Sequence, residues 1–497
     1  MSIDRQLAAI LAIDPGAPVL DHGGRWWSYG ELADAMAAIR STLDMVAPGS
    51  GARIGVVTRN RPGPLAAILA LLVSGRCFVV LNPMLPADRQ LNDVNGLRLA
   101  AVIGEEGDLA MLGDRATAAG AAPIQIGPGF DAPQLRSRGH RSTYGEDPSV
   151  AVEMLTSGTT GPPKRVPLTR KAFELAIAGA ATLEKGREAD EAPRLRAATT
   201  TLPGPISHIG SLFSLLATLI AGRRICLLER FTVEGWLDAV RRHRPKVASV
   251  VPAGLRMLLD ANVAKDDLSS LVALRSGTAP LDPAVAREFL ARYDLPVLQN
   301  YGATEFVGGI AGWTLDDFHA HFLAKADSTG RIQPGVAARI VDADTGTEQA
   351  PGQEGVLELK TGMTGQGETW VRTSDRAMID ADHFLYIRGR MDNAIIRGGF
   401  KIHPDEVVRV LEQHPAVREA VVVGVPDPRL GEMPAAAILL RKGAEPPSDA
   451  ELHDFARTRL MAYQVPVRFL IVDELPRTSS MKPSLIDVAK LFEAAGA

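Results

Sequence analysis

The stretch MLTSGTTGPPKRVPLT, residues 154–169, is the most informative part of this chain. An apolar, strand-like run leads into a turn rich in glycine and hydroxyl side chains, followed by two prolines and Lys164. Glycines let the backbone approach an anion, while hydroxyls, N–H groups and a lysine charge bind phosphate oxygens. The pattern predicts a phosphate-binding loop. Its candidate ligands are Thr156, Ser157, Gly158, Thr159, Thr160 and Lys164.

Two other interpretations of this loop are weaker. A P-loop needs G-x-x-x-x-G-K-[ST], and here Lys164 follows Pro163 instead of Gly. A purely structural turn is common among Gly/Ser/Thr segments, but so many phosphate-binding residue types directly after a strand favour a functional loop.

Outward from this loop, short β-rich runs alternate with helical patterns from about residue 50 to residue 310. This alternation indicates βαβ units with parallel sheets. The runs are ARIGVV from 52, CFVVL from 77, SVAVEML from 149, ICLL from 225, VASVV from 247, LVALRS from 271 and PVLQNY from 296. The segment APIQIGPGFDAPQ, near 122–134, is interpreted as a loop.

The remainder of the chain has a different pattern. Between about 330 and 390, short strands separated by turn residues indicate an antiparallel sheet or a small barrel. After Gly389 we expect a small α+β domain, with a helix opened by Pro404, strands in REAVVVGV, AAAILLR and VRFLIVDEL, and a helix near ELHDFARTRLM.

Composition limits the classes of protein that need be considered. A chain of 497 residues exceeds one typical domain, so several cores are expected. The 54 basic and 58 acidic residues nearly balance, which excludes the strong field of a nucleic-acid-binding protein and favours small-molecule partners.

Two features indicate the compartment. Cys77 and Cys226 are the only cysteines, which excludes a disulfide framework, and we expect both to be inert core thiols. The N-terminal segment lacks the pattern of a signal peptide, and the longest apolar stretches, 65–73 and 209–221, are too short to span a bilayer. We therefore expect a soluble, cytoplasmic protein without an integral membrane segment.

Further motifs give a specific resemblance. TSGTTGPPK resembles the signature loop of the adenylate-forming superfamily, which includes acyl-CoA synthetases, luciferases and peptide-synthetase adenylation domains. Seven further motifs follow in the order typical of this family. Each of them alone has an ordinary structural explanation, but seven in this order make coincidence improbable. They are PISHIG around His208, RSGTAPL at 275–281, NYGATE at 300–305, TSD ending at Asp375, GRMD with Arg390 and Asp392, RGGFKIHPDE from 397, and PRTSSMK ending at Lys482.

The resemblance implies a role for each motif. His208 would gate the carboxylate pocket, Tyr301 would stack on adenine and Asp375 would bind the ribose. Thr304 would contact the α-phosphate, Glu305 would hold Mg²⁺, and Lys482 would be the adenylation lysine. Further implied nucleotide- and CoA-binding residues are Gly277, Thr278, Ala279, Asn300, Gly302, Arg390, Gly398, Gly399 and Phe400, and Asp392 would be the hinge.

The implied activity is that of an ATP-dependent acid-thiol ligase using ATP, Mg²⁺ and coenzyme A. A carboxylate is a poor electrophile, so it first attacks the α-phosphate of ATP, and two approaching anions need a metal and cations to stabilise the charge. Positioning then supplies most of the acceleration. A thiol next attacks the acyl-AMP after the C-terminal domain rotates, exchanging Lys482 for the Gly398–Phe400 hairpin.

Three positions depart from the family pattern. Arg165 stands where Gly commonly follows the loop lysine, Ser374 replaces the Gly of T-G-D, and Met481 replaces the Gly before Lys482. Met481 matters most, because a bulky residue restricts the loop that delivers the lysine.

Other functions remain open at this stage. The acyl group could be loaded onto a carrier protein instead of CoA, although no carrier domain is visible, or the chain could be a non-catalytic nucleotide-binding relative. The failed P-loop pattern disfavours a P-loop ATPase or kinase. An amino-acid substrate is disfavoured because Ile209 stands where an Asp would pair with its amino group.

The expected architecture is that of the family. Residues 1–391 would form two doubly wound α/β subdomains and a small β-barrel, and residues 392–497 a mobile α+β lid, as a monomer or homodimer. The expected acyl pocket is lined mostly by small or apolar residues, which favours an uncharged acyl group from a fatty, aromatic or alicyclic acid. Its residues are His208, Ile209, Ser211, Ser276, Gly277, Gly302, Ala303 and Val307.

Overall fold

The computed structural model describes residues 2–47, 49–140, 147–155, 164–182, 192–364, 369–478 and 482–495. They form two compact units. The first comprises the described residues of Met1–Thr156, Lys164–Val336 and Thr361–Thr369, and the second those of Ala337–Lys360 and Trp370–Ala497. The predicted loop residues Thr156, Ser157, Gly158, Thr159 and Thr160, and also Met481, lie outside the described residues.

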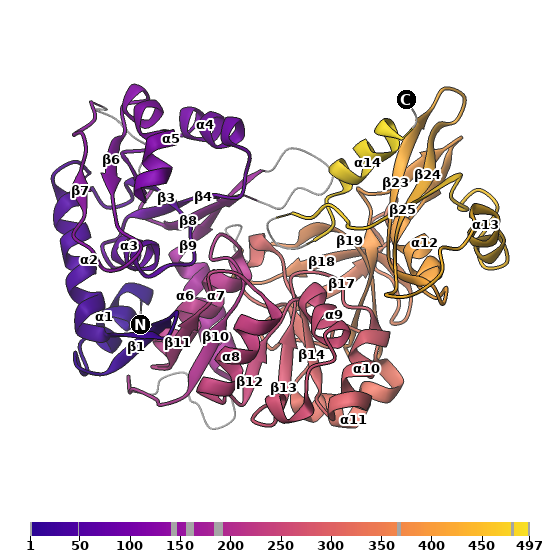
Figure 1. Ribbon diagram of the computed structural model, residues 1–497, viewed down its shortest axis with the longest axis horizontal. Helices are drawn as coiled ribbons and strands as arrows, with labels where there is room; N and C mark the ends of the chain where they lie inside the picture. The colour runs from indigo at the N-terminus through magenta and orange to yellow at the C-terminus, as the bar shows by residue number, and fades with distance from the viewer. Residues whose placement is uncertain are drawn as a thin grey trace. The chain divides into compact units, whose positions relative to one another are not determined.

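The first unit contains a mixed sheet of strands in the order β7-β6-β5-β3-β4-β8-β9 (Figure 1). Its central strands are parallel and almost fully buried, as expected where helices cover both faces. The strands are β3 (Arg53–Val57), β4 (Cys77–Leu81), β5 (Ala101–Gly104), β6 (Ala122–Gln125), β7 (Gln134–Leu135), β8 (Val150–Leu155) and β9 (Arg165–Thr169), and the helices between them are α3 (Pro62–Val73), α4 (Ala87–Gly96) and α5 (Glu106–Ala118).

One expectation for this sheet is wrong. The segment near 122–134, interpreted as a loop, contains β6 and β7. Pro123 hides the strand signal, because proline lacks the N–H that a ladder uses. Residues 122–125 nevertheless pair in parallel with β5, while β7 pairs on the other side of β6.

A second sheet has the order β10-β11-β1-β2, and a third the order β12-β13-β14-β15-β16. In the second sheet, β10, β11 and β1 are parallel, and in the third, β12, β13 and β14 are parallel. The strands are β1 (Pro18–His22), β2 (Arg25–Ser28), β10 (Thr199–Leu202), β11 (Arg224–Leu227), β12 (Val247–Ser249), β13 (Ala273–Ser276), β14 (Val297–Tyr301), β15 (Ala311–Gly312) and β16 (Arg331–Ile332). The helices of this part are α1 (Ile3–Leu11), α2 (Tyr29–Asp44), α6 (Arg170–Thr182), α7 (Ile209–Ile220), α8 (Val233–His243), α9 (Pro252–Asp260), α10 (Pro283–Tyr293) and α11 (Leu315–Lys325), with 3-10 turns η1 (Lys265–Leu268) and η2 (Thr304–Phe306).

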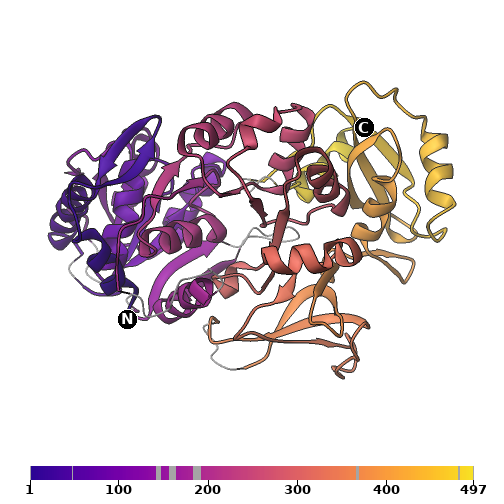
Figure 2. The same ribbon diagram turned by 90° about the horizontal axis from the view of Figure 1, so that it is seen from below.

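The second unit contains two sheets. The antiparallel sheet β17-β18-β19-β20 is seen in orange at the bottom of Figure 2 and confirms the antiparallel pattern expected there. The other sheet has the order β22-β21-β24-β23, with β25 paired to β24. The strands are β17 (Ala337–Val341), β18 (Glu354–Lys360), β19 (Val371–Ile379), β20 (Leu385–Arg390), β21 (Ile395–Arg397), β22 (Phe400–Ile402), β23 (Val417–Asp427), β24 (Gly431–Leu440) and β25 (Arg468–Val472), and the helices are α12 (Pro404–Leu411), α13 (Asp449–Arg457) and α14 (Leu485–Ala494).

Strand β23 shows why the sheet β22-β21-β24-β23 is covered on both faces. Successive side chains of a strand point to opposite faces. Val422 accordingly packs in the cluster with Val407 of α12, whereas Val421 and Val423 pack in the cluster with Phe492 of α14. The α+β arrangement expected from the sequence is confirmed.

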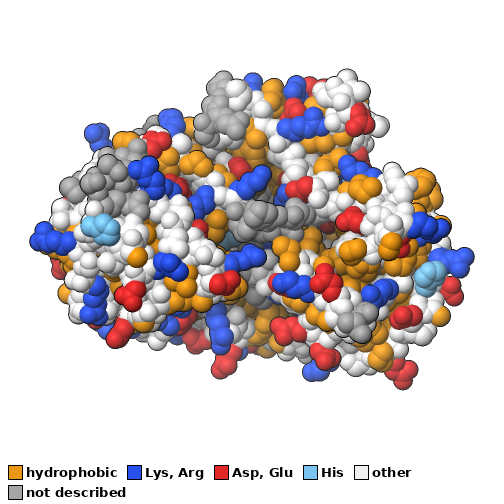
Figure 3. Space-filling view, turned by 90° about the horizontal axis from the view of Figure 1, so that it is seen from above, with side chains coloured by type: hydrophobic (Ala, Val, Ile, Leu, Met, Phe, Trp, Pro, Cys, Tyr) orange, Lys and Arg blue, Asp and Glu red, His pale blue; other side chains and the backbone are white. Residues whose placement is uncertain are grey.

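No described helix has the length and apolar character needed to cross a membrane. Acidic and basic side chains are interspersed over the face drawn in Figure 3, which agrees with the near balance of charges in the sequence.

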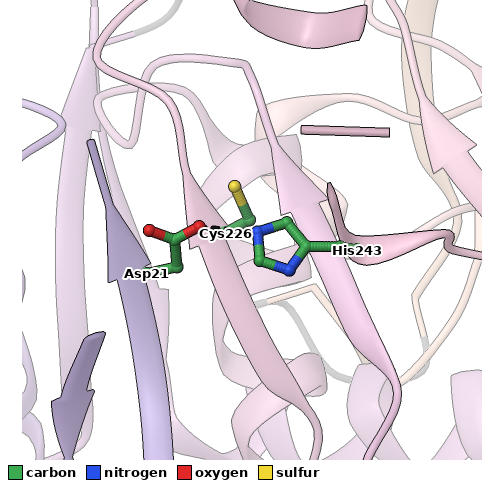
Figure 4. A group of neighbouring side chains, drawn as sticks. All are labelled: Asp21, Cys226 and His243. Carbon is green, nitrogen blue, oxygen red and sulfur yellow. Dashed lines mark hydrogen bonds and ion pairs between the residues drawn. The ribbon is translucent and has the colours of Figure 1, made fainter. Parts of the chain in front are cut away.

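A buried ionic cluster fastens β1 to α8 and β11 (Figure 4). One carboxylate oxygen of Asp21 accepts a hydrogen bond from the Gly24 N–H at 3.0 Å, and the other accepts from Arg242 and lies 2.6 Å from His243 Nε2. Cys226 lies beside them, and donor atoms of Asp21, Cys226 and His243 fall within 4.8 Å of one another. The carboxylate is already satisfied, and burial raises the pKa of the Cys226 thiol to about 12, so the cluster is structural and not a metal site.

We expect Asp21→Asn to lower the free energy of unfolding by about 3 kcal/mol, because a buried charged network loses its anion. Burial raises the pKa of Asp21, but the hydrogen bonds from His243 and Arg242 lower it overall below its ordinary value of 3.8. The stabilisation is therefore complete above that value and is lost as pH falls through the folded-state pKa. Urea unfolding of both proteins between pH 3 and 7 measures this difference.

Asp238→Asn is the matched control. Asp238 pairs with the same Arg242, but its side chain is 56% exposed, so its loss should cost less than about 1 kcal/mol. Equal effects of the two substitutions would contradict the structural role of Asp21.

Candidate functional site

The carboxyl ends of β13 and β14 lie side by side in the first unit. The strands are parallel, with Ser276 paired to Gln299, so the turns that follow them meet at one edge of the sheet. A Cβ atom on Gly277 would lie 2.2 Å from Oδ1 of Asn300. This close approach explains the glycine, and it brings the motifs RSGTAPL and NYGATE together.

Two hydroxyls at this edge have no partner among the residues that the structure describes. Ser276 Oγ and Thr278 Oγ1 are buried and make no hydrogen bond within the described chain. Thr278 also has φ of 73°, a left-handed conformation that is costly for a threonine. Unsatisfied buried hydroxyls and backbone strain are typical of sites where a polar ligand completes the structure.

The segment around His208 approaches the same edge. His208 caps the N-terminus of α7, and its Nδ1 atom accepts a hydrogen bond from the Gly210 N–H at 3.3 Å. A Cβ on Gly210 would lie 3.4 Å from Cγ2 of Thr278. The structure thus brings His208 together with Gly277, Thr278 and Asn300.

Sequence reasoning missed Asn60, which holds this segment in place. The side-chain amide of Asn60 donates to the Gly204 carbonyl at 2.8 Å and to the Leu228 carbonyl at 3.0 Å, and its oxygen accepts from the Ile206 N–H at 2.8 Å. Asn60 is only 4% exposed. The available signal was a polar residue just after a buried parallel strand.

The end of the predicted phosphate loop lies near the NYGATE segment. Lys164 directly precedes β9, and β9 packs against η2, which contains Thr304 and Glu305. Lys164 and Glu305 are both exposed. Arg165, the departure from the family's glycine, donates to the Val80 carbonyl at 3.2 Å and forms an ion pair with Asp93. The larger residue thus anchors the base of the loop.

The second unit gathers a different set of predicted residues. Asp375 of β19 lies opposite Arg390 of β20 in the antiparallel ladder. Both lie close enough to Lys482 to affect the pKa of its amine. Arg390 donates to Asp392 through Nε at 2.8 Å and Nη2 at 2.6 Å. Nη2 also donates to Oγ of Ser374 at 2.6 Å, so the serine that replaces the family's glycine adds a hydrogen bond.

Backbone hydrogen bonds hold Lys482 close to the residues that precede its loop. The Thr478 N–H donates to the Lys482 carbonyl at 2.7 Å, and the Ser484 N–H donates to the Pro476 carbonyl at 2.8 Å. Arg477 is tied to Glu419 of β23 by a 2.7 Å ion pair. These contacts fix both ends of the segment that carries the lysine.

The glycine hairpin forms the turn between β21 and β22. Gly398 and Gly399 have φ of 55° and 87°, as a tight two-residue hairpin turn requires. The Gly398 N–H donates to the Leu430 carbonyl at 2.7 Å. Phe400 is 57% exposed and stacks on Tyr463, with ring centroids 4.8 Å apart.

These two clusters carry the motifs from which the resemblance was inferred, and comparison with known proteins agrees. A family model described as AMP-binding enzyme matches residues 8–367, and one described as AMP-binding enzyme C-terminal domain matches residues 406–482. The chain belongs to the AMP-binding enzyme family. The resemblance to adenylate-forming enzymes is thereby confirmed.

Similar proteins support the same assignment and indicate the class of reaction. A fatty acid–[acyl-carrier-protein] ligase, ScoC, of Streptomyces coeruleorubidus is 30% identical over 94% of this chain and 92% of its own. A 2-succinylbenzoate–CoA ligase of Bacillus licheniformis is 35% identical over 67% of this chain and 68% of its own. ATP-bound MatB from Rhodopseudomonas palustris matches with a TM-score of 0.84 and 22% identity, covering 100% of both chains. The predicted enzyme class, an AMP-forming acid-thiol ligase, and the fold are confirmed.

We expect Lys482 to titrate below an ordinary lysine. Burial lowers its pKa most, Arg390 lowers it further, and Asp375 opposes both. Asp375→Asn should therefore lower this pKa again, whereas Arg390→Gln should raise it. Reductive ¹³C-methylation followed by NMR titration measures the shift, and Lys482→Arg identifies the signal. Shifts of the opposite sign would contradict the electrostatic coupling of these three residues.

Proposed function

We propose that this enzyme is an acyl-CoA ligase that activates an uncharged fatty, aromatic or alicyclic carboxylic acid with ATP and Mg²⁺ and transfers the acyl group to coenzyme A. The observation that carries the proposal is the partly buried position of Lys482 near Asp375 and Arg390, where desolvation lowers the pKa of the lysine. A lysine shielded from water can stabilise the negative charge that develops on a phosphate during the reaction. The neighbouring Asp375 carboxylate would bind the ribose of the same nucleotide.

In the first half-reaction, a carboxylate oxygen attacks the α-phosphorus of ATP, the new P–O bond forms and pyrophosphate leaves. Lys482 would lie between carboxylate and α-phosphate, and Thr304 would donate to the α-phosphate. Tyr301 would stack on adenine, with Asp375 holding the ribose. Lys164 and the hydroxyl-rich loop before it would hold the β- and γ-phosphates.

The oxygen donors of the NYGATE segment fit Mg²⁺. Glu305 offers an exposed carboxylate, and Thr304 next to it a hydroxyl; Mg²⁺ prefers such hard ligands together with phosphate oxygens. A bound Mg²⁺ would neutralise phosphate charge, while Glu305 would set its position.

In the second half-reaction, a thiol sulfur attacks the acyl carbonyl carbon, the thioester bond forms, AMP leaves and the thiol proton passes to solvent. We propose that residues 392–497 rotate about Asp392 to bring the Gly398–Phe400 hairpin to the pantetheine arm. Such rotation must break the contact of Arg376 on β19 with Glu406 on α12, where Nη2 and Oε1 lie 2.5 Å apart.

The proposed acid specificity rests on uncharged residues next to His208 and in and just after the NYGATE segment. Ile209 and Val307 are buried, and a Cβ on Gly302 would lie 2.8 Å from the Gly308 carbonyl oxygen. None of these offers a charge to a substrate tail, which favours an uncharged acyl group. The two buried free thiols, Cys77 and Cys226, fit the proposed cytoplasmic location.

A carrier protein is the second candidate acceptor. The similarity to the ScoC ligase extends over 94% of this chain, and the name of that relative states a carrier-protein acceptor. The exposed Phe400 beside the glycine hairpin would suit a pantetheine arm from either source.

We expect Lys482→Ala to reduce acyl-AMP formation by at least about 100-fold, because the cation at the reacting phosphate is lost. Transfer from synthetic acyl-AMP to the thiol should change much less. Pyrophosphate, AMP and acyl product are followed by mass spectrometry across a panel of acids. Lys490→Ala, at a 63% exposed lysine of α14, is the control. No turnover of any acid by the wild type would favour a non-catalytic nucleotide-binding protein.

The acceptor is tested with the best acid from that panel. We expect coenzyme A to discharge the acyl-AMP at least about tenfold faster than a phosphopantetheine-loaded acyl carrier protein at equal concentration. Single-turnover kinetics of acyl-AMP decay measure both rates. The reverse order would assign the enzyme to carrier-protein loading.

A further inference from the structure

Two residues in the first turn of α12, Asp405 and Glu406, contact the antiparallel sheet of the second unit. Nη2 of Arg376, on β19, lies 2.5 Å from Oε1 of Glu406. The backbone N–H of Arg390, at the end of β20, donates to the carboxylate of Asp405. A Cβ on Gly389, where φ is 128°, would lie 2.3 Å from Oδ2 of Asp405, so this turn packs directly on the end of the strand.

Glu406 is held in place by a second contact within residues 392–497, the proposed lid. Its Oε2 atom accepts a hydrogen bond from Nε2 of Gln464 at 2.9 Å. Gln464 itself is fixed in a turn, because its Oε1 accepts from the Met461 N–H at 3.0 Å and its own N–H donates to the Met461 carbonyl at 2.8 Å. Both carboxylate oxygens of Glu406 are therefore engaged, and its pairing with Arg376 costs little further side-chain entropy.

Arg376 is held in a similar way by the antiparallel sheet. Nη1 lies 3.4 Å from Oε2 of Glu354 on β18, and Nη2 also donates to the Arg388 carbonyl on β20 at 3.4 Å. The side chain of Arg376 is 16% exposed and that of Glu406 is 30% exposed. Solvent screens such a pair less than a pair on the open surface, so its contribution is larger than that of an ordinary surface ion pair.

This ion pair lies next to the proposed reaction centre. Arg376 directly follows Asp375 on β19, and Asp375 lies close enough to Lys482 to affect the pKa of the lysine. Glu406 and Lys482 both belong to the proposed lid. The orientation of the lid that pairs Glu406 with Arg376 is therefore also the one that places Lys482 near Asp375.

We propose that Glu406 is a positioning residue that, through Arg376, holds the lid in the orientation that brings Lys482 to the reacting groups, and so favours acyl-AMP formation over acyl transfer. This inference rests on the proposed function, because it assigns one orientation of the lid to each half-reaction. Loss of the ion pair should shift the equilibrium between the two orientations away from the one that the structure shows.

The first test is independent of activity. Glu406→Gln removes the charge but keeps an oxygen that can accept from Gln464. Burial is the largest cause that lowers the pKa of Lys482, so release of the lid should raise this pKa toward its ordinary value, measured by NMR titration of the ¹³C-methylated protein without substrates. A direct charge effect has the opposite sign, because loss of a negative charge lowers the pKa of a lysine. Arg376→Gln should act in the same direction as Glu406→Gln, and the double variant should exceed neither.

The second test compares the two half-reactions. We expect Glu406→Gln to lower the ratio of the rate of acyl-AMP formation to the rate of acyl transfer from synthetic acyl-AMP by at least about tenfold, because a partly buried ion pair is lost. Glu445→Gln, the same substitution at an exposed residue of the lid, should leave the ratio unchanged. Thermal unfolding shows whether each variant is folded, and Arg376→Gln supplies the same tests if Glu406→Gln does not fold.

The proposal is overturned if Glu406→Gln leaves the pKa of Lys482 at its wild-type value or lowers it. It is also overturned if the variant slows both half-reactions by the same factor, since a merely structural role would do so. The pKa measurement needs no turnover, so it distinguishes a failure of this proposal from a failure of the proposed function, in which the wild type activates no acid.

Discussion

The parallel register of β13 and β14 is the constraint on which the candidate site of the first unit depends. Because Ser276 is paired with Gln299, both strands end at the same level, and their turns must share one space. That space admits no side chain at residue 277, as the approach of Asn300 shows. The buried hydroxyls of Ser276 and Thr278 are left without a hydrogen-bond partner among the described residues. The pairing of these two strands thus brings together Gly277, the hydroxyls of Ser276 and Thr278, and the amide of Asn300.

The second unit has a different organisation, based on side-chain charge. Arg390 joins Ser374 and Asp392, and the same guanidinium influences Lys482. A substitution that looked like a simple departure from the family pattern, serine for glycine at 374, therefore strengthens the attachment of the arginine beside the proposed hinge. An ion pair also joins the antiparallel sheet to the C-terminal part within this compact unit: Arg376 of β19 pairs with Glu406 of α12.

Much of this arrangement was predictable from local sequence. Apolar runs predicted the positions of β3, β4, β11 and β14, because each run is contiguous in the sequence. The motifs singled out Asp375 and Lys482, which the structure brings near each other, and their roles stay predictions. The position of Asn60 just after a buried parallel strand was a signal, but its hydrogen bonds were not predictable, since its partners lie 144 to 168 residues away in the sequence. Strand β6 was missed because Pro123 mimics a loop.

The closed loop that carries Lys482 has a consequence for the entropy of the reaction. With Thr478 bonded to the Lys482 carbonyl and Arg477 fixed to β23, the lysine backbone moves with its unit and not as an independent flexible arm. Its location then has few degrees of freedom beyond the orientation of the unit itself. A lysine on a long free loop would have to search for its position at every turnover and lose that freedom each time. Here the restriction is built in at folding, so in the proposed mechanism the remaining search for position would be made by the whole domain that carries the lysine.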